Sequence, residues 1–311
     1  MSTSVLSLSR VELEALPITT DDVVERIEQL ILGQGDGTVW NAPKIAVVPP
    51  DERYLMATLA ACDDPPYMAV KSLLQNPRNP ARGLPTINAL VTLLHGETGV
   101  PLATIDGNWV TAVRTAGLSA VAARRLARPD SASLAFIGCG VQAHSHLDAL
   151  AALFPLTEVR AFGRGALNRD ALCAAARERG LEARASVSAE DAIRGADMVV
   201  TSVTCPPALE PFLDAGWLSP GAFAAVTDRG PWQPQSMVEL DRIIIDDMAQ
   251  EALMDEPMVA PELVSGDLTG LVTGAIASRQ NADERTAFVF RGLALGDLAL
   301  AALAYESAVV R

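Results

Sequence analysis

The sequence predicts an α/β protein with a doubly wound parallel sheet in its central part and a mostly β segment before it. Between about residues 133 and 247, short apolar runs alternate with Ala-rich stretches of helical periodicity, which is typical of a parallel sheet with right-handed crossovers. The first of these runs leads directly into a Gly-rich turn. The chain has 311 residues, more than one compact core usually contains, so we expect two domains.

Six apolar runs of the central part are predicted strands, which is enough for a complete doubly wound domain. These strands cover residues 133–138, 159–163, 183–186, 198–203, 222–228 and 242–247. Stretches with helical periodicity lie between them. The resulting helices are expected at residues 141–153, 167–179 and 189–194.

The first 110 residues show a different pattern. Residues 20–32 have helical periodicity, and short β-type runs broken by Pro and Gly follow. These runs cover residues 39–49, 54–61, 68–74 and 85–94. The segment contains no Gly-rich phosphate loop, so we expect it to bind a substrate or to mediate dimerisation.

The composition excludes several classes of function. The net charge is −14 and the pI about 4.6, which disfavours binding to nucleic acid or to an anionic membrane. No apolar stretch reaches the roughly 20 residues that span a bilayer, and residues 1–10 lack a signal core. No metal site is expected, since His144 and His146 have no evident third ligand. Scattered cysteines without a CxxC pair favour reduced thiols in the cytoplasm; they are Cys62, Cys139, Cys173 and Cys205.

The Gly-rich turn has the sequence GCGVQA at residues 138–143, a GxGxxA pattern between a buried strand and a helix. The first glycine permits a tight turn, the second lets a pyrophosphate approach the backbone, and the alanine lets the helix pack close to the strand. The free N–H groups of the helix then face the phosphates. Because the pattern opens a run of six strands, it predicts a Rossmann-type domain with a dinucleotide at Gly138, Gly140, Val141 and Gln142.

The end of the second predicted strand indicates which dinucleotide is bound. An acid there would bind the ribose 2′-hydroxyl of NAD, but this chain has Gly163 and Arg164. A guanidinium can pair with a 2′-phosphate through two hydrogen bonds. We therefore predict that NADP(H) is favoured over NAD(H), and that Gly163 and Arg164 contact it.

Two further helices are predicted outside the strand-rich segments. The Ala-, Leu- and Arg-rich stretch at residues 115–127 would join them, and the Ala/Leu-rich tail from residue 288 is expected to pack back on the first domain as a helix. The predicted substrate-binding and dimerisation domain is therefore residues 1–114 with 288–311. The Rossmann NAD(P)-binding domain is residues 115–287.

Motifs spread over nearly the whole chain form a specific pattern. They are VK at residues 70–71, NPARGLPT at 79–86, TAVRTA at 111–116, SAVAA at 119–123, LAR at 126–128, GCGVQA at 138–143, GAD at 195–197, TSVT at 201–204 and FRGLALGD at 290–297. Together they resemble the motifs of the ornithine cyclodeaminase/mu-crystallin family. The resemblance implies a homodimer formed through the N-terminal domain. It does not fix the reaction, because the family includes cyclodeaminases, ketimine reductases, alanine dehydrogenases, N-alkyl amino acid dehydrogenases and ligand-binding crystallins.

The resemblance also implies roles for individual residues. Family members hold the substrate carboxylate with a lysine and an arginine, which match Lys71 and Arg114 here. Both stand in apolar surroundings, where a cation needs an anion. A further basic position matches Lys44, where lysine lacks the bidentate grip of arginine. The positions near the cofactor match Thr86, Arg114 and Thr115. Thr204 and Val226 should border the cofactor because they lie at the ends of the fourth and fifth strands, where ligands of such sheets bind.

Three positions depart from the family pattern or leave alternatives open. The cyclodeaminase Asp that follows the fifth strand falls on Arg229 when aligned without a gap, with Asp228 one residue early. A Glu near the substrate amine is replaced by Tyr54. Asp297, in the C-terminal motif, either faces the active site or caps the last helix. The first two departures weaken the case for ornithine, because its ring closure needs a base.

These observations predict an NAD(P)-dependent oxidoreductase of a small amino or imino acid. The favoured activity is a ketimine reductase acting on a pyrroline- or piperideine-2-carboxylate, or an amino acid dehydrogenase. In this hypothesis Lys71 and Arg114 hold the carboxylate, and Lys71 or Asp228 supplies the proton. One alternative is ornithine cyclodeaminase, a lyase with bound NAD that forms proline and ammonia. The other is a non-catalytic, NADPH-dependent ligand-binding protein of the crystallin type.

Overall fold

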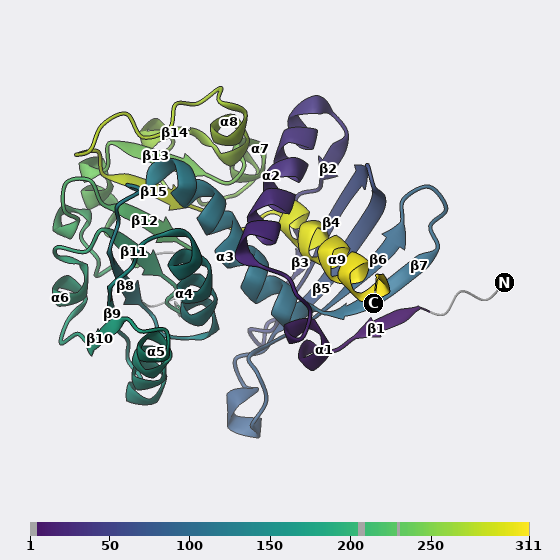
Figure 1. Ribbon diagram of the computed structural model, residues 1–311, viewed down its shortest axis with the longest axis horizontal. Helices are drawn as coiled ribbons and strands as arrows, with labels where there is room; N and C mark the ends of the chain where they lie inside the picture. The colour runs from purple at the N-terminus through teal and green to yellow at the C-terminus, as the bar shows by residue number, and fades with distance from the viewer. Residues whose placement is uncertain (1–4, 205–208, 229–230, 311) are drawn as a thin grey trace. The chain divides into compact units, whose positions relative to one another are not determined.

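The computed structural model describes residues 5–204, 209–228 and 231–310. The chain divides into two compact units, Met1–Gly117 with Leu293–Arg311, and Leu118–Gly292 (Figure 1). The first unit is therefore discontinuous, since it contains both the N-terminal part of the chain and the last helix.

A mixed sheet of seven strands forms the first unit. Its order is β1-β7-β6-β5-β4-β2, with β3 paired to β4. Neighbouring strands are antiparallel except for the parallel pair β1 and β7. The strands are β1 (Leu6–Leu8), β2 (Val39–Asn41), β3 (Ile45–Val47), β4 (Tyr54–Asp63), β5 (Pro66–Gln75), β6 (Ile87–His95) and β7 (Pro101–Asp106).

Helices cover one face of this sheet. Helix α9 (Ala294–Val309) packs on β4, β5 and β6 and against α2 (Thr20–Asp36) (Figure 1). Side chains alternate between the two faces of a strand, and in β4 Thr58 is buried whereas Leu55 and Leu59 are exposed. The remaining helical segments are α1 (Arg10–Glu14), the 3₁₀ turn η1 (Pro80–Arg82) and α3 (Gly107–Leu126), which continues into the second unit.

A parallel sheet of eight strands forms the second unit, in the order β10-β9-β8-β11-β12-β15-β13-β14. The strands are β8 (Ser133–Ile137), β9 (Glu158–Phe162), β10 (Glu182–Ala185), β11 (Met198–Thr201), β12 (Phe223–Val226), β13 (Arg242–Ile245), β14 (Val264–Asp267) and β15 (Thr286–Val289). Every residue of β8, β11, β12 and β15 is buried, as expected for central strands of a parallel sheet.

The strand order reverses at β8. This strand has β9 on one side and β11 on the other, so the carboxyl ends of β8 and β11 form the crevice where doubly wound sheets bind their ligands. The connecting helices are α4 (Val141–Leu153), α5 (Ala166–Glu178), α6 (Ala189–Ile193), α7 (Met248–Ala252) and α8 (Leu268–Thr273). Short 3₁₀ turns complete the unit, namely η2 (Ala215–Trp217), η3 (Pro234–Glu239) and η4 (Pro261–Leu263).

The structure corrects the boundary predicted at residue 288. That residue, Phe288, lies in β15, which pairs with β12 and β13 of the second unit, and the first unit resumes only at Leu293. The cause is the shortness of β15: its four residues are apolar apart from Thr286 and merge in the sequence with the apolar helix that follows. The strands β1, β7 and β14 were likewise not predicted, and α3 begins at Gly107 rather than at residue 115.

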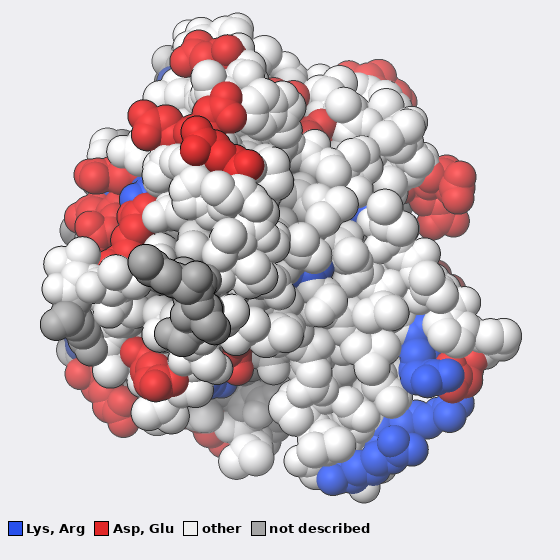
Figure 2. All heavy atoms as spheres, turned by 90° about the vertical axis from the view of Figure 1, so that its right-hand side faces the viewer, with Lys and Arg blue, Asp and Glu red and all other residues white. Residues whose placement is uncertain are grey.

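The charges of the surface agree with an acidic chain. Figure 2 shows one side of the molecule, where acidic side chains lie scattered around the margin and basic ones gather mainly at one corner. Among the described residues, no helix combines the length and the apolar character needed to cross a membrane.

Candidate functional site

The Gly-rich turn connects β8 to α4 and has the geometry that its sequence predicts. Gly138 has a φ of 94°, and a Cβ atom at this position would lie 2.5 Å from the carbonyl oxygen of Ser202. Only glycine is accommodated there. Gly140 is the N-cap of α4, and no atom of the described residues lies within 4 Å of the place that its Cβ would occupy. The first glycine thus permits the turn, and the second keeps the space in front of the helix open.

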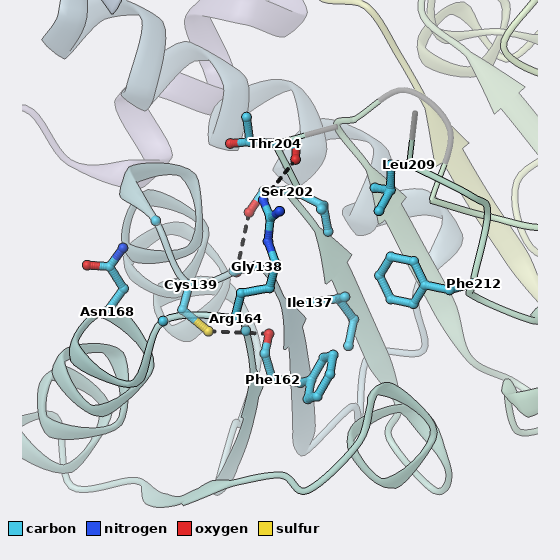
Figure 3. A pocket seen from close by; sticks show the side chains of 14 residues that line it. Ile137, Gly138, Cys139, Phe162, Arg164, Asn168, Ser202, Thr204, Leu209 and Phe212 are labelled. Carbon is cyan, nitrogen blue, oxygen red and sulfur yellow. Dashed lines mark hydrogen bonds between the residues drawn. The ribbon is translucent and has the colours of Figure 1, made fainter. Parts of the chain in front are cut away.

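A pocket of about 280 Å³ lies at the carboxyl ends of β8, β9 and β11 (Figure 3). Five predicted residues line it, namely Gly138, Gly140, Gly163, Arg164 and Thr204. The other lining residues were not predicted to bind the cofactor; they are Ile137, Cys139, Phe162, Gly165, Asn168, Ser202, Val203, Leu209 and Phe212. The pocket therefore occupies the crevice that the strand order predicts.

Arg164 extends across this pocket. Its Nη2 atom donates a hydrogen bond of 3.1 Å to the carbonyl oxygen of Thr204 (Figure 3), although the residue as a whole is exposed. Asn168, at the start of α5, lines the same pocket. No acid of the described residues lines it, so a 2′-phosphate would meet a guanidinium and an amide there rather than a carboxylate.

The residues of this pocket fit a dinucleotide. Because Gly140 has no side chain, it leaves the first N–H groups of α4 uncapped, and such groups bind phosphate. In the first turn of α4, Gln142 Oε1 is buried without a hydrogen-bond partner among the described residues. Val141, also predicted to contact the cofactor, is 62% exposed at the start of the helix.

Cys139 also lines the pocket, where its surroundings disfavour the thiolate form. Burial raises the pKa of its thiol to about 11, so the reactive thiolate is scarce at neutral pH. Its Sγ atom lies 3.5 Å from the carbonyl oxygen of Phe162. A small side chain at this position fills the space beside Gly163, where an added Cβ would lie 3.1 Å from Sγ.

Asp228 follows β12 at the same edge of the sheet. It is 7% exposed, and both of its oxygens accept hydrogen bonds, from Thr201 Oγ1 at 2.7 Å and from the N–H of Val203 at 2.6 Å. Burial raises the pKa of this carboxyl to about 6 against the opposing effect of these hydrogen bonds. Val226, at the end of β12, is 4% exposed and is not one of the described residues that line the pocket. Arg229 lies outside the described residues.

The first unit contains a second cluster, made of buried charged side chains. Lys71, on β5, is 1% exposed, and its Nζ atom lies 2.7 Å from Asp297 Oδ1 on α9. Thr58, the register partner of Lys71 on β4, donates to Asp297 Oδ2 at 2.8 Å. Arg114, on α3, is 5% exposed and places Nε 3.2 Å from the same Oδ1 atom. Asp297 therefore binds Thr58 and both cations, and it does not cap α9.

This cluster has an excess of positive charge. In the described part of the chain, Lys71 and Arg114 share Asp297 as their ion-pair partner. Burial, opposed by Asp297 and reinforced by Arg114, lowers the pKa of Lys71 to about 8. Burial alone would raise the pKa of Asp297, but the two cations lower it below its usual value. At neutral pH two cations thus face one carboxylate, an arrangement that favours an additional anion.

Unsatisfied polar atoms lie at the same place. Arg114 Nε makes no aligned hydrogen bond within the described structure, and Thr111 Oγ1, one turn earlier on α3, is also buried without a partner. Residues three apart lie on one face of a helix. A carboxylate or hydroxyl of a ligand could satisfy both atoms.

The structure places the other residues predicted in the first unit as follows. Thr115 Oγ1 donates to the carbonyl oxygen of Thr111 at 2.7 Å. Lys44, between β2 and β3, and Thr86, just before β6, are half-buried. Tyr54 Oη lies 3.7 Å from Met56 Sδ.

His146, one of the two histidines considered as metal ligands, makes other contacts. His146 is fully buried, with Nε2 2.9 Å from Ser119 Oγ and Nδ1 2.7 Å from the carbonyl oxygen of Gln142. Burial lowers its pKa to about 4, so it is neutral at physiological pH. Across the residues with described positions, no group of three metal-binding side chains occurs.

Comparisons with known proteins identify the family. A profile of the ornithine cyclodeaminase/mu-crystallin family matches residues 1–311. The chain belongs to this family.

Individual family members are similar over their whole length. An alanine dehydrogenase of Archaeoglobus fulgidus is 31% identical over 98% of this chain and 95% of its own. The structure of Thermococcus litoralis Δ1-pyrroline-2-carboxylate reductase, solved with NADH and L-proline, has a TM-score of 0.89 at 27% identity and covers 98% of this chain and 97% of its own. An archaeal alanine dehydrogenase dimer with bound NAD has a TM-score of 0.87 at 28% identity, over 98% of this chain and 96% of its own.

The sequence did not predict that Asp297 pairs with Lys71 and Arg114. Its burial could have been predicted, because Asp297 is the single charged residue between Leu293 and Ala304. A lone acid in such an apolar helix is expected to be buried with a cation. Thr58 gave no comparable signal, since a threonine is ordinary in a strand.

Proposed function

We propose that this family member is an NAD(P)-dependent oxidoreductase that interconverts a small 2-imino acid and the corresponding amino acid. The observation that carries the proposal is the buried cluster of Lys71, Arg114 and Asp297, with two cations and one carboxylate. The excess charge matches one substrate carboxylate. The dinucleotide pocket of the second unit supports the same conclusion.

The residues of the cluster would have different roles in binding the substrate and transferring the proton. Arg114, always charged, and Lys71 hold the substrate carboxylate, while Asp297 keeps both side chains in place. A nicotinamide dinucleotide, when bound, supplies the hydride for the imine carbon. The ammonium of Lys71, with a pKa of about 8, supplies the proton for the imine nitrogen. Hydride and proton together convert the C=N double bond to an amine.

The charge balance also restricts the substrate. A single excess positive charge suits a monocarboxylate, and a second carboxylate would need a further cation. A pyrroline- or piperideine-2-carboxylate meets this condition. Two relatives of similar length are named for reactions of this kind, an alanine dehydrogenase and a Δ1-pyrroline-2-carboxylate reductase.

We further propose NADP(H) as the favoured cofactor, because Arg164 and Asn168 line the pocket and no acid among the described residues does. Relatives of known structure hold NADH and NAD, and the assay below compares NADPH with NADH. The three cysteines of the described part, all buried and unpaired, are consistent with the reducing cytoplasm that the sequence predicts.

The open face of the first sheet supports a homodimer. Large apolar side chains are exposed on β3, β4, β5 and β6, among them Ile45, Leu59, Met68 and Leu90. Apolar patches of this kind mark interfaces, and a second copy of the chain is the occupant that we propose. One relative is described as a dimer. Sedimentation of the wild type and of Leu59→Asp tests it, with a monomeric wild type as the contrary result.

Nicotinamide absorbance tests the proposed reaction. The purified protein is given NADPH or NADH with a panel of cyclic ketimines, and with 2-oxo acids plus amines. We expect oxidation of the cofactor with a ketimine that carries one carboxylate. If no member reacts but ornithine yields ammonia and proline, the enzyme is a cyclodeaminase. Dinucleotide binding without any turnover would favour a ligand-binding protein.

A further inference from the structure

Asp228 lies beside the dinucleotide pocket, but its contacts point to a different task from that of an acid or base. Its two oxygens accept hydrogen bonds from Thr201 Oγ1 and from the N–H of Val203. The Nε1 atom of Trp232 lies 3.4 Å from the same Thr201 hydroxyl. The carboxylate is thereby fixed toward the end of β11 through both oxygens.

The segment that Asp228 holds forms one wall of the pocket. Ser202, Val203 and Thr204 all line it. Ser202 Oγ lies 3.4 Å from the carbonyl oxygen of Gly138, and the carbonyl oxygen of Thr204 accepts from Arg164 (Figure 3). The two ends of this segment therefore contact the Gly-rich turn and Arg164, the residue predicted to bind a 2′-phosphate, and Asp228 fixes its middle.

We propose that Asp228 is a positioning residue of the dinucleotide pocket, which acts through the backbone of Val203, and that it does not transfer a proton in the reaction. This inference rests on the proposed function in one respect, that the pocket binds a nicotinamide dinucleotide. Proton transfer then remains with Lys71.

Two substitutions of Asp228 separate the two roles. In Asp228→Asn, the amide oxygen can still accept from Val203 N–H, and the amide nitrogen can donate to Thr201 Oγ1. The anchor is kept while the acid is lost. In Asp228→Ala, both contacts disappear, including the hydrogen bond to the N–H of Val203, and the loss of such a bond to a charged group is costly.

Asp246 offers a matched control at the same edge of the sheet. It is 1% exposed, follows β13, and accepts from the N–H groups of Arg291 at 3.0 Å and of Gly292 at 2.7 Å. It thus also anchors a backbone segment, through its Oδ2 atom, but neither Arg291 nor Gly292 is among the residues that line the pocket. Asp246→Ala should lower the melting temperature without weakening dinucleotide binding.

The test is an equilibrium titration of the full chain with NADPH and with NADH, followed by nicotinamide fluorescence. We expect Asp228→Ala to raise the Kd about tenfold and Asp228→Asn to leave it within about twofold of the wild type. With an active substrate, Asp228→Asn should retain most of kcat. If Asp228→Ala does not fold, Thr201→Val removes one of the two donors, and we expect a rise in Kd of about threefold.

Three results would overturn the proposal. One is wild-type affinity in Asp228→Ala or, where that variant does not fold, in Thr201→Val. The second is loss of turnover in Asp228→Asn with an unchanged Kd, which would make Asp228 a proton donor. The third is equal weakening in Asp246→Ala, which would indicate a general effect on stability. Failure of the wild type to bind either dinucleotide would instead refute the proposed function.

Discussion

The candidate sites of the two units are made of different kinds of residues. In the second unit four of the residues that line the pocket are glycines, and Gly140 leaves the space in front of α4 open. In the first unit the cluster is formed by charged side chains that are almost completely buried. A pocket at a Gly-rich turn and a helix N-terminus depends on open space and on oriented N–H groups. A cluster of buried charged side chains depends on its balance of charge. Substitutions in the two units should therefore fail in different ways.

The largest effect is expected from Asp297→Asn, which leaves Lys71 and Arg114 buried without their common carboxylate. We expect the free energy of unfolding to fall by about 3–5 kcal/mol, measured by denaturant unfolding. Glu306→Gln, also on α9, is the matched control, because its ion pair with Arg26 is partly exposed, at 32% and 18% for the two side chains. It should cost about 1 kcal/mol or less. Equal effects of the two substitutions would contradict the importance of charge balance in the first unit.

Lys71→Met tests the role of the same cluster in the reaction. The remaining pair of Arg114 and Asp297 is neutral, so the fold should persist. We expect kcat/KM to fall about a thousandfold, while the Kd for the dinucleotide stays unchanged. Initial rates and a dinucleotide titration measure the two quantities. Activity close to that of the wild type would remove Lys71 from the mechanism.

A pair of glycine substitutions probes the second unit. Gly138→Ala places a Cβ 2.5 Å from the carbonyl oxygen of Ser202 at a φ of 94°, so we expect stability to fall by about 1–3 kcal/mol. Gly140→Ala meets no described neighbour within 4 Å. It should keep the melting temperature and raise the dinucleotide Kd about tenfold. Wild-type affinity in Gly140→Ala would show that no pyrophosphate approaches the backbone there.

Arg164→Gln tests the side-chain contribution to the pocket of the second unit. Among the described residues, Arg164 is the one cationic side chain that lines it. We expect the Kd for NADPH to rise about tenfold, from the loss of hydrogen bonds to a charged group, with the Kd for NADH unchanged. NADH is the internal control. Equal Kd values of the wild type for the two cofactors would show that the predicted preference for NADP(H) is wrong.

The smallest effect is a dependence on pH. Since the pKa of Lys71 is lowered to about 8, kcat/KM should decline as pH rises through that value, because the ammonium is lost. The free energy of unfolding should instead increase with pH between about 8 and about 10.4. In this range Lys71 binds its proton in the unfolded chain, where its pKa is about 10.4, but has lost it in the folded protein. A pH–rate profile that stays flat across this range would argue against Lys71 as the titrating group.

The sequence predicted the pocket of the second unit better than the cluster of the first. The glycines at 138 and 140 and the arginine at 164 follow successive strands, so local patterns locate them. The cluster joins Lys71 and Asp297 across 226 positions of sequence, and no local pattern states which strand lies under which helix. Lys71 and Arg114 were found through the resemblance to a family, but their carboxylate partner needed the packing of α9.

Strand order was the other feature that local patterns did not contain. The six predicted strands of the second unit are present, yet β15 enters between β12 and β13 from far along the chain. Its four residues are too few to show a periodicity that differs from the helix after them. The position of Asp228 next to Val203 likewise depends on β11 and β12 being neighbours.

The late arrival of β15 and α9 has a consequence for synthesis of the chain. During translation β12 and β13 emerge before the strand that separates them, and the sheet of the first unit emerges long before the helix that covers Lys71. Until residues 286–309 have left the ribosome, the second sheet cannot reach its final strand order and the first sheet cannot be covered by α9. Nascent chains of this protein thus lack one central strand of the second sheet and leave Lys71 of the first sheet uncovered. We expect them to depend on chaperones more than a protein whose domains are completed one after the other.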